Sequence, residues 1–165
     1  RSKKMNTLIV YATQYGFTAD CAASLKQQLN GEATLVDLTK QAAPNPADFD
    51  AVIVGGSIYM GKVQSSVTDF CADYERELLQ KPLGLFLCCG LPKQIQQSMA
   101  ASFPSSLIPH AKATGCFGGE LRTNRMKPMH KFIASMMQKA GAKDGIESPK
   151  ANPQAIADFA RAMNA

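Results

Sequence analysis

Apolar residues recur along the chain in short blocks, and the spacing inside each block predicts its secondary structure. Five blocks are nearly continuous, which is typical of strands in a parallel sheet that is covered on both faces. We expect these strands at residues 7–12, 33–38, 51–55, 84–89 and 113–117.

Other blocks place their apolar residues three and four positions apart, which predicts amphipathic helices. From Met129 to Ala140 the apolar side chains fall at i, i+3, i+4, i+7, i+8 and i+11. The last predicted helix begins at Pro153, because proline is well suited to the first helical position. The predicted helices are residues 18–29, 67–79, 95–103, 129–140 and 153–163.

Strands that alternate with helices favour an α/β fold, an open doubly wound sheet with right-handed crossovers and helices on both faces. We expect one domain over residues 5–165, and we interpret residues 1–4 as a tag remnant or a disordered N-terminus. Ligands of such folds bind beyond the carboxyl ends of the strands. The segments that follow the first, third and fourth strands are therefore predicted to form one site.

Composition narrows the class of protein. The chain has 165 residues, of which 45% are hydrophobic and 19% charged, the profile of a single soluble domain. No apolar run reaches the length of a membrane span, and no signal peptide is visible. Five cysteines without framework spacing argue against a disulfide scaffold. We expect a cytoplasmic protein with reduced thiols.

The turn after the first strand reads Thr13-Gln14-Tyr15-Gly16-Phe17-Thr18, a Thr-x-x-Gly-x-Thr pattern at the start of a helix. Hydroxyls and free backbone N–H groups at a helix N-terminus suit an anion such as a phosphate. The turn lacks both the Walker A pattern and Gly-x-Gly-x-x-Gly, which favours a monophosphate. The alternative is a simple helix start with Thr18 as N-cap and Asp20 in the first turn.

The turns after the third and fourth strands offer glycines and apolar side chains. Gly55 and Gly56 would let the backbone approach a flat ligand, and Tyr59 offers an aromatic face. Residues 88–92 would cover the opposite side. A monophosphate at one end and a planar ring at the other predict flavin mononucleotide (FMN) as the cofactor.

The chain resembles flavodoxin-type proteins over nearly its whole length, in the segments 10–18, 54–62, 87–92 and 117–121. It is most similar to the branch that contains the menaquinone-dependent protoporphyrinogen oxidases. The shared features are the Gly-x-Ser-Ile segment at residues 55–58 and a basic stretch before the last helix. The resemblance implies FMN, electron transfer and the strand order 2-1-3-4-5. Electron-shuttling flavodoxins are usually acidic, whereas this chain has a net charge of +5.

The resemblance also implies which residues contact the cofactor. Residues 13–18 would hold the phosphate, and the other two turns would line the two sides of the isoalloxazine ring. The implied contacts are Thr13, Gln14, Tyr15, Gly16, Phe17 and Thr18 for the phosphate, Ser57, Ile58, Tyr59, Met60 and Gly61 for one side of the ring, and Cys89, Gly90, Leu91 and Pro92 for the other.

Three further sets of possible functional residues have a simpler, structural interpretation. Cys88 and Cys89 suggest a redox dithiol, but adjacent cysteines close only a strained ring, so we favour buried thiols. Asp37 has the spacing of a ribose-binding acid, but without the three-glycine turn a surface strand end is the better interpretation. His110 and His130 lack the spacing of a metal site.

The positive charge is concentrated in residues 121–150, which carry seven basic and two acidic side chains. No aromatic residues interleave with them as in a nucleic-acid stacking platform, so we expect no nucleic-acid partner. The stretch 122–143 is either a solvated basic face or a peripheral contact with an anionic membrane. Two functions remain open. One is an electron carrier that docks on a redox partner protein. The other is an FMN enzyme that uses a small donor or acceptor, such as a porphyrinogen or a quinone, in heme biosynthesis.

Overall fold

A computed structural model describes residues 5–13, 16–58, 63–88, 95–118 and 153–165. Its centre is the predicted five-stranded parallel sheet, and its order β2-β1-β3-β4-β5 is the one that the resemblance to flavodoxins implied. The strands are β1 (Asn6–Tyr11), β2 (Glu32–Asp37), β3 (Ala51–Ser57), β4 (Leu83–Cys88) and β5 (Ala113–Cys116).

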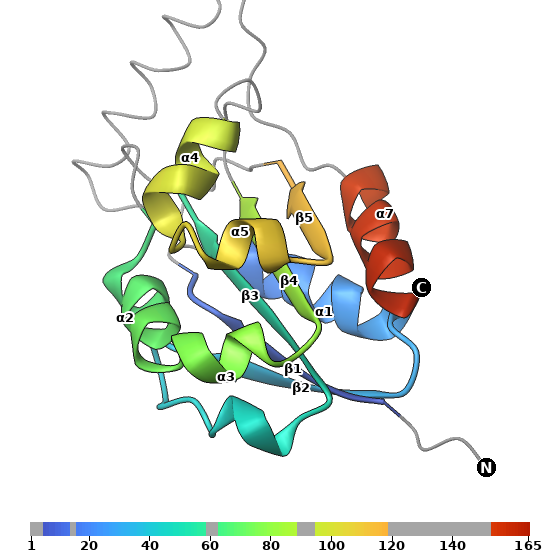
Figure 1. The fold of residues 1–165 in the computed structure, drawn as a ribbon. Coiled ribbons are helices and arrows are strands. Elements are labelled where there is room, and N and C mark those ends of the chain that lie inside the picture. Colours follow the sequence, from blue (N-terminus) through green and yellow to red (C-terminus); the bar gives the residue numbers. More distant parts are fainter. Residues whose placement is uncertain (1–4, 14–15, 59–62, 89–94, 119–152) are drawn as a thin grey trace, which may run out of the picture.

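Helices cover both faces of the sheet (Figure 1). The helices α1 and α7 lie on one face, and α2, α3, α4 and α5 lie on the other. Their bounds are α1 (Phe17–Gln28), α2 (Ser65–Asp73), α3 (Glu75–Leu79), α4 (Ile95–Ser102), α5 (Leu107–His110) and α7 (Pro153–Asn164), with a short 3-10 helix η1 at Pro46–Asp48. Among the described residues, no helix has the length and apolar character needed to cross a membrane.

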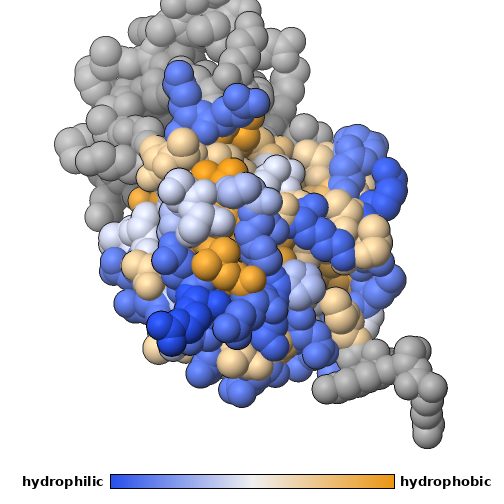
Figure 2. All heavy atoms as spheres, viewed as in Figure 1, coloured by the Kyte–Doolittle hydropathy of each residue, from blue (hydrophilic) through white to orange (hydrophobic). Residues whose placement is uncertain are grey.

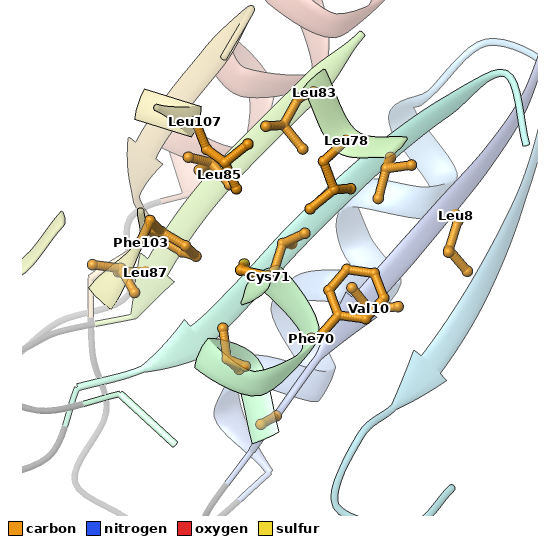
Figure 3. Close-up of a cluster of buried hydrophobic side chains, with 14 of the residues drawn as sticks. Leu8, Val10, Phe70, Cys71, Leu78, Leu83, Leu85, Leu87, Phe103 and Leu107 are labelled. Atoms are coloured by element: carbon orange, nitrogen blue, oxygen red, sulfur yellow. The ribbon is translucent and has the colours of Figure 1, made fainter. Parts of the chain in front are cut away.

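Each central strand sends alternate side chains to opposite faces, so the sheet separates two cores. In β1, Leu8 and Val10 pack under α2 to α5, whereas Ile9 and Tyr11 pack under α1 and α7. Figure 3 shows the first core, where side chains of β4 meet Leu78 and Leu107. Burial of each large aliphatic side chain contributes about 1.5–3 kcal/mol, so both layers of helices are held firmly to the sheet.

Among the described residues, the predicted elements agree with the structure except that one helix is divided and two short ones, η1 and α5, were not predicted. The helix expected at 67–79 is two helices, because the backbone at Tyr74 leaves the helical region with φ −119° and ψ 20°. Helix α5 was missed because a single turn is too short to show an apolar period. The helix predicted at 129–140 and the basic stretch lie outside the described residues.

Candidate functional site

The ends of β1, β3 and β4 meet at one edge of the sheet, as predicted (Figure 1). The Ala12 N–H donates to the carbonyl oxygen of Gly55 at 3.3 Å, which ties the end of β1 to β3. The Ile58 N–H donates to the carbonyl oxygen of Cys88 at 2.8 Å, which ties the end of β3 to β4. The parallel register therefore places these three strand ends side by side at the candidate site.

The turn between β1 and α1 is held by its own residues. The Gly16 N–H donates to Thr13 Oγ1 at 2.9 Å. Gly16 has a φ of 92°, a left-handed conformation that favours glycine, and it is the N-cap of α1. The simpler interpretation with Thr18 as N-cap is therefore wrong, because Thr18 already lies inside the first turn of the helix.

The Thr18 hydroxyl is the strongest sign of a ligand at this turn. Thr18 is only 1% exposed, and its Oγ1 makes no hydrogen bond of ordinary geometry within the part of the chain that the structure describes, although the Cys88 thiol, a weak acceptor, lies beside it. A buried hydroxyl without a partner costs about 1–3 kcal/mol, and the backbone N–H groups in the first turn of a helix point toward its N-terminus. A phosphate bound at this helix N-terminus would supply acceptors for both. The residues present therefore fit an anionic group.

The two glycines at the end of β3 have a steric role that the sequence analysis did not predict. A Cβ atom on Gly55 would lie 2.1 Å from the ring of Phe86, and one on Gly56 would lie 2.4 Å from Cγ2 of Val63. At both positions the missing Cβ atom thus leaves room for a neighbouring side chain of the protein. The expectation that their backbone also approaches a flat ligand stays a prediction.

A hydrogen-bonded pair that sequence reasoning missed stands at the end of β3. The Ser57 N–H donates to Gln64 Oε1 at 3.1 Å, and Gln64 Nε2 donates to Ser57 Oγ at 2.6 Å. Gln64 is the N-cap residue of α2, so the pair closes the base of the turn between β3 and α2. The only sequence signal was an amide directly before a helix, which is too common to indicate a site.

The thiol of Cys88 is buried beneath this edge, and its pKa is well above that of an ordinary cysteine. The main cause is a hydrogen bond with Cys21, followed by burial. A contact with the Thr18 hydroxyl lowers the pKa of this thiol, though by less than the other causes raise it. Because sulfur is a weak acceptor, this contact does not replace the oxygen atoms of a phosphate for Thr18. A thiol that keeps its proton is a poor nucleophile, which agrees with the interpretation of Cys88 as a packing residue. Its predicted neighbour Cys89 lies outside the described residues.

The structure describes only part of the predicted cofactor contacts. Thr13, Gly16, Phe17, Thr18, Ser57 and Ile58 lie at the candidate edge. Gln14, Tyr15, Tyr59, Met60, Gly61, Cys89, Gly90, Leu91 and Pro92 lie outside the described residues. Asp37 accepts the N–H of Thr39 at 2.9 Å, as expected of a surface strand end. The described residues contain no cluster of three side chains that could hold a metal ion.

Comparisons with known proteins agree with this geometry. A family model described as a flavodoxin domain matches residues 8–146. No curated protein matches the chain. Among solved structures, a flavodoxin from the domain Archaea is 15% identical, with a TM-score of 0.50, over 98% of this chain and 100% of its own.

Two further solved structures share the fold. The Streptococcus pneumonia TIGR4 flavodoxin is 14% identical, with a TM-score of 0.50, over 96% of this chain and 97% of its own. A Fusobacterium nucleatum flavodoxin bound to flavin mononucleotide is 13% identical, with a TM-score of 0.50, over 68% of this chain and 69% of its own. At these identities the structural likeness shows the fold alone.

Proposed function

The chain belongs to the flavodoxin domain family, and from that premise we propose that it binds FMN at the β1, β3 and β4 edge and transfers electrons. The observation that carries the proposal is the buried, unpartnered hydroxyl of Thr18 at the N-terminus of α1. The flavodoxin of Fusobacterium nucleatum with bound flavin mononucleotide supports the same cofactor.

Thr13, Gly16 and Thr18 would hold the phosphate. Thr13 Oγ1 accepts the Gly16 N–H and so keeps its own proton available for a ligand oxygen. Gly16 turns the chain so that α1 begins at the site, and Thr18 supplies a second hydroxyl. Ser57 and Ile58 would stand along the ring. The bound cofactor would supply the electron chemistry, and the protein would bind and orient it.

The phosphate assignment is tested by comparing FMN with riboflavin, which has the same ring and no phosphate. Charged hydrogen bonds to the phosphate contribute about 1.5–3 kcal/mol each, so FMN should bind at least about tenfold more tightly. Each flavin is titrated into the apoprotein while its fluorescence is followed. Equal affinities, or no flavin retained after desalting, would contradict the proposal.

The uneven charge of the chain suits an electron carrier that docks on a redox partner protein. The described residues contain ten acidic and six basic side chains, so the basic excess of the chain lies elsewhere in the sequence. Hydrophilic side chains cover most of the described surface on the face in Figure 2, and apolar ones form separate groups. The whole protein has a net charge of +5, so its basic surface would guide an acidic partner by long-range attraction, which salt weakens.

A second candidate is an oxidase of the protoporphyrinogen type that passes electrons to a quinone. The Gly-x-Ser-Ile segment at residues 55–58 and the basic stretch 122–143 favour it, the latter as a contact for an acidic substrate or an anionic membrane. Turnover of protoporphyrinogen with menadione, measured against a heat-inactivated control, distinguishes the two. Turnover would support the oxidase, and its absence in FMN-loaded protein would favour the carrier.

A further inference from the structure

Two buried thiols from distant parts of the sequence meet beneath the candidate edge. Cys21 lies on the face of α1 that packs on the sheet, three residues after Thr18, and Cys88 is the last residue of β4. Both belong to the core under α1 and α7, with exposed fractions of 3% and 4%. The side chains of Cys21 and Cys88 are in hydrogen-bond contact, so folding brings these two thiols together.

The other described thiols are placed differently. Cys71 belongs to the core on the opposite face of the sheet, under α2 to α5. Cys116 is in register with Leu87, whose side chain points into that opposite core, so the strand directs the Cys116 side chain away from Cys88. Among the described cysteines, Cys21 and Cys88 are therefore the pair whose thiols the fold places in contact.

The pair is protected at rest. The hydrogen bond with Cys21, followed by burial, raises the pKa of the Cys88 thiol, so this thiol keeps its proton at neutral pH. A protonated thiol is a poor nucleophile, and the two side chains then pack as small apolar groups. Two thiols in contact are nevertheless the arrangement from which a disulfide forms when an oxidant is supplied.

We propose that Cys21 and Cys88 form a reversible disulfide when the protein meets a peroxide. In the first step, the Cys21 thiolate attacks one oxygen of hydrogen peroxide and becomes a sulfenic acid, and the other oxygen leaves as water. In the second step, the Cys88 sulfur displaces the sulfenic oxygen, which leaves as a second water. The two sulfur atoms lose two electrons, and these electrons reduce the peroxide.

The N-terminus of α1 gives the oxidant a route to the pair. Its N-cap residue, Gly16, makes no side-chain hydrogen bond to the helix, and the buried Thr18 hydroxyl in the first turn lacks an ordinary partner. A helix end that is held by few bonds opens locally at a low cost in free energy. Cys88 holds its proton firmly, so the first attack falls to Cys21 and Cys88 is the resolving thiol.

The proposed bond joins α1 to β4, two elements that border the candidate site. It requires no bound FMN, because the reacting atoms are the two sulfur atoms and the peroxide. The inference thus goes beyond the proposed function and can fail or succeed independently of it.

The test uses a variant that keeps only this pair of thiols, with Cys71→Ala, Cys89→Ala and Cys116→Ala. The protein is reduced, separated from the reductant and treated with hydrogen peroxide at pH 8. It is then denatured, and the remaining thiols are alkylated. We expect both thiols to escape alkylation, the intact mass to fall by that of two hydrogen atoms, and dithiothreitol to restore both thiols.

Two controls show that the bond joins this pair within one folded chain. Cys21→Ala or Cys88→Ala in the same background leaves a single thiol, which should give no loss of two hydrogens from the monomer. The wild type is oxidised in parallel, and mass spectrometry of its fragments should identify a bond between Cys21 and Cys88. In urea this preference should disappear, because the folded contact selects the pair. The wild-type experiment also decides the question if the triple variant does not fold, which circular dichroism shows.

The outcomes are distinct. A folded protein that keeps both thiols, or that gains oxygen on sulfur without losing two hydrogens, would overturn the inference. A wild type that instead joins other cysteines, or that shows the same bonds when folded and in urea, would overturn it as well. Neither result bears on FMN binding, which the flavin titrations measure separately.

Discussion

Gly55 and Phe86 lie opposite each other on β3 and β4, and the space left by the missing Cβ of Gly55 is filled by the Phe86 ring. That ring stacks on Phe117 with a centroid distance of 4.6 Å and meets the edge of Phe159 at 6.0 Å. The aromatic cluster packs β4 against the end of β5 and α7, on the face of the sheet opposite to α2. Because Phe86 needs the space at Gly55 to reach this cluster, the glycine stabilises that face. Gly55 contributes by leaving this space free, since its backbone has an ordinary strand conformation that other residues could also adopt.

We expect Gly55→Ala to lower the free energy of unfolding by about 1–3 kcal/mol, the usual cost of overpacking a core. Chemical denaturation followed by circular dichroism measures this. Gly115→Ala is the matched control, because its Cβ would lie 3.3 Å from the nearest ring atoms instead of 2.1 Å. Phe86→Leu in the Gly55→Ala background should recover part of the loss. An equal loss in both glycine variants would contradict the steric explanation.

The sequence predicted the fold well because the sheet and its helices depend on local apolar patterns. The blocks that contain Leu8, Val54 and Leu85 were nearly continuous in apolar residues, as expected of strands with a core on each face. The break at Tyr74 was not predictable, because the apolar stripe continues through it and only the backbone turns. An apolar pattern shows which residues share a face of a helix, but it does not show where the helix is interrupted.

The site was predicted less completely, for a different reason. The Thr13 to Thr18 turn was recognisable because its residue types and spacing carry the chemistry. Gln64 was missed because its importance depends on the close approach of two segments at Gly56, which only the folded chain reveals. The steric role of Gly55 was missed for the same reason, since its partner Phe86 is distant in the sequence.

Asn164 connects the ends of two helices. Its Oδ1 accepts the N–H of Asn30 at 2.9 Å, and its Nδ2 donates to the carbonyl oxygen of Gln28 at 3.0 Å. We expect Asn164→Ala to lower the free energy of unfolding by about 0.5–1.5 kcal/mol per lost bond, less where water replaces the amide. Asn164→Asp keeps the acceptor and loses the donor, so its stability should fall between the two. Urea denaturation of the three proteins gives the order, and an alanine variant as stable as wild type would show that the contact contributes nothing.

Thr18 should affect ligand binding and stability in opposite directions. Thr18→Val keeps the shape of the side chain and removes a buried hydroxyl that lacks a partner. The apoprotein should therefore be as stable as wild type or more stable by up to about 1–3 kcal/mol. FMN should bind about tenfold more weakly, and riboflavin should bind unchanged.

Titration of the two flavins into both proteins measures this difference. Thr34→Val on the exposed side of β2 is the control for the substitution itself. A Thr18→Val protein that is strongly destabilised, or that loses both flavins equally, would contradict a phosphate contact for this hydroxyl.

The buried thiol of Cys71 should make the protein less stable at alkaline pH. Burial, and then the nearby charge of Glu75, raise the pKa of this thiol to about 12. In the unfolded chain the thiol ionises near pH 9, so the unfolded state gains a thiolate that the folded state does not form. The stability from Cys71 is thus fully present below pH 9 and is lost as the pH rises toward 12, by about 1.4 kcal/mol per pH unit.

Cys71→Val removes the titration and preserves the apolar contact, so its free energy of unfolding should fall less steeply than that of the wild type between pH 9 and about 11. Other groups, such as Tyr11 with a pKa raised by burial and by Asp37, titrate equally in both proteins and cancel in the difference. Parallel pH profiles would show that Cys71 ionises in the folded state as readily as in the unfolded one. In that case iodoacetamide should also modify Cys71 in the native protein at pH 8, where we expect modification only after denaturation.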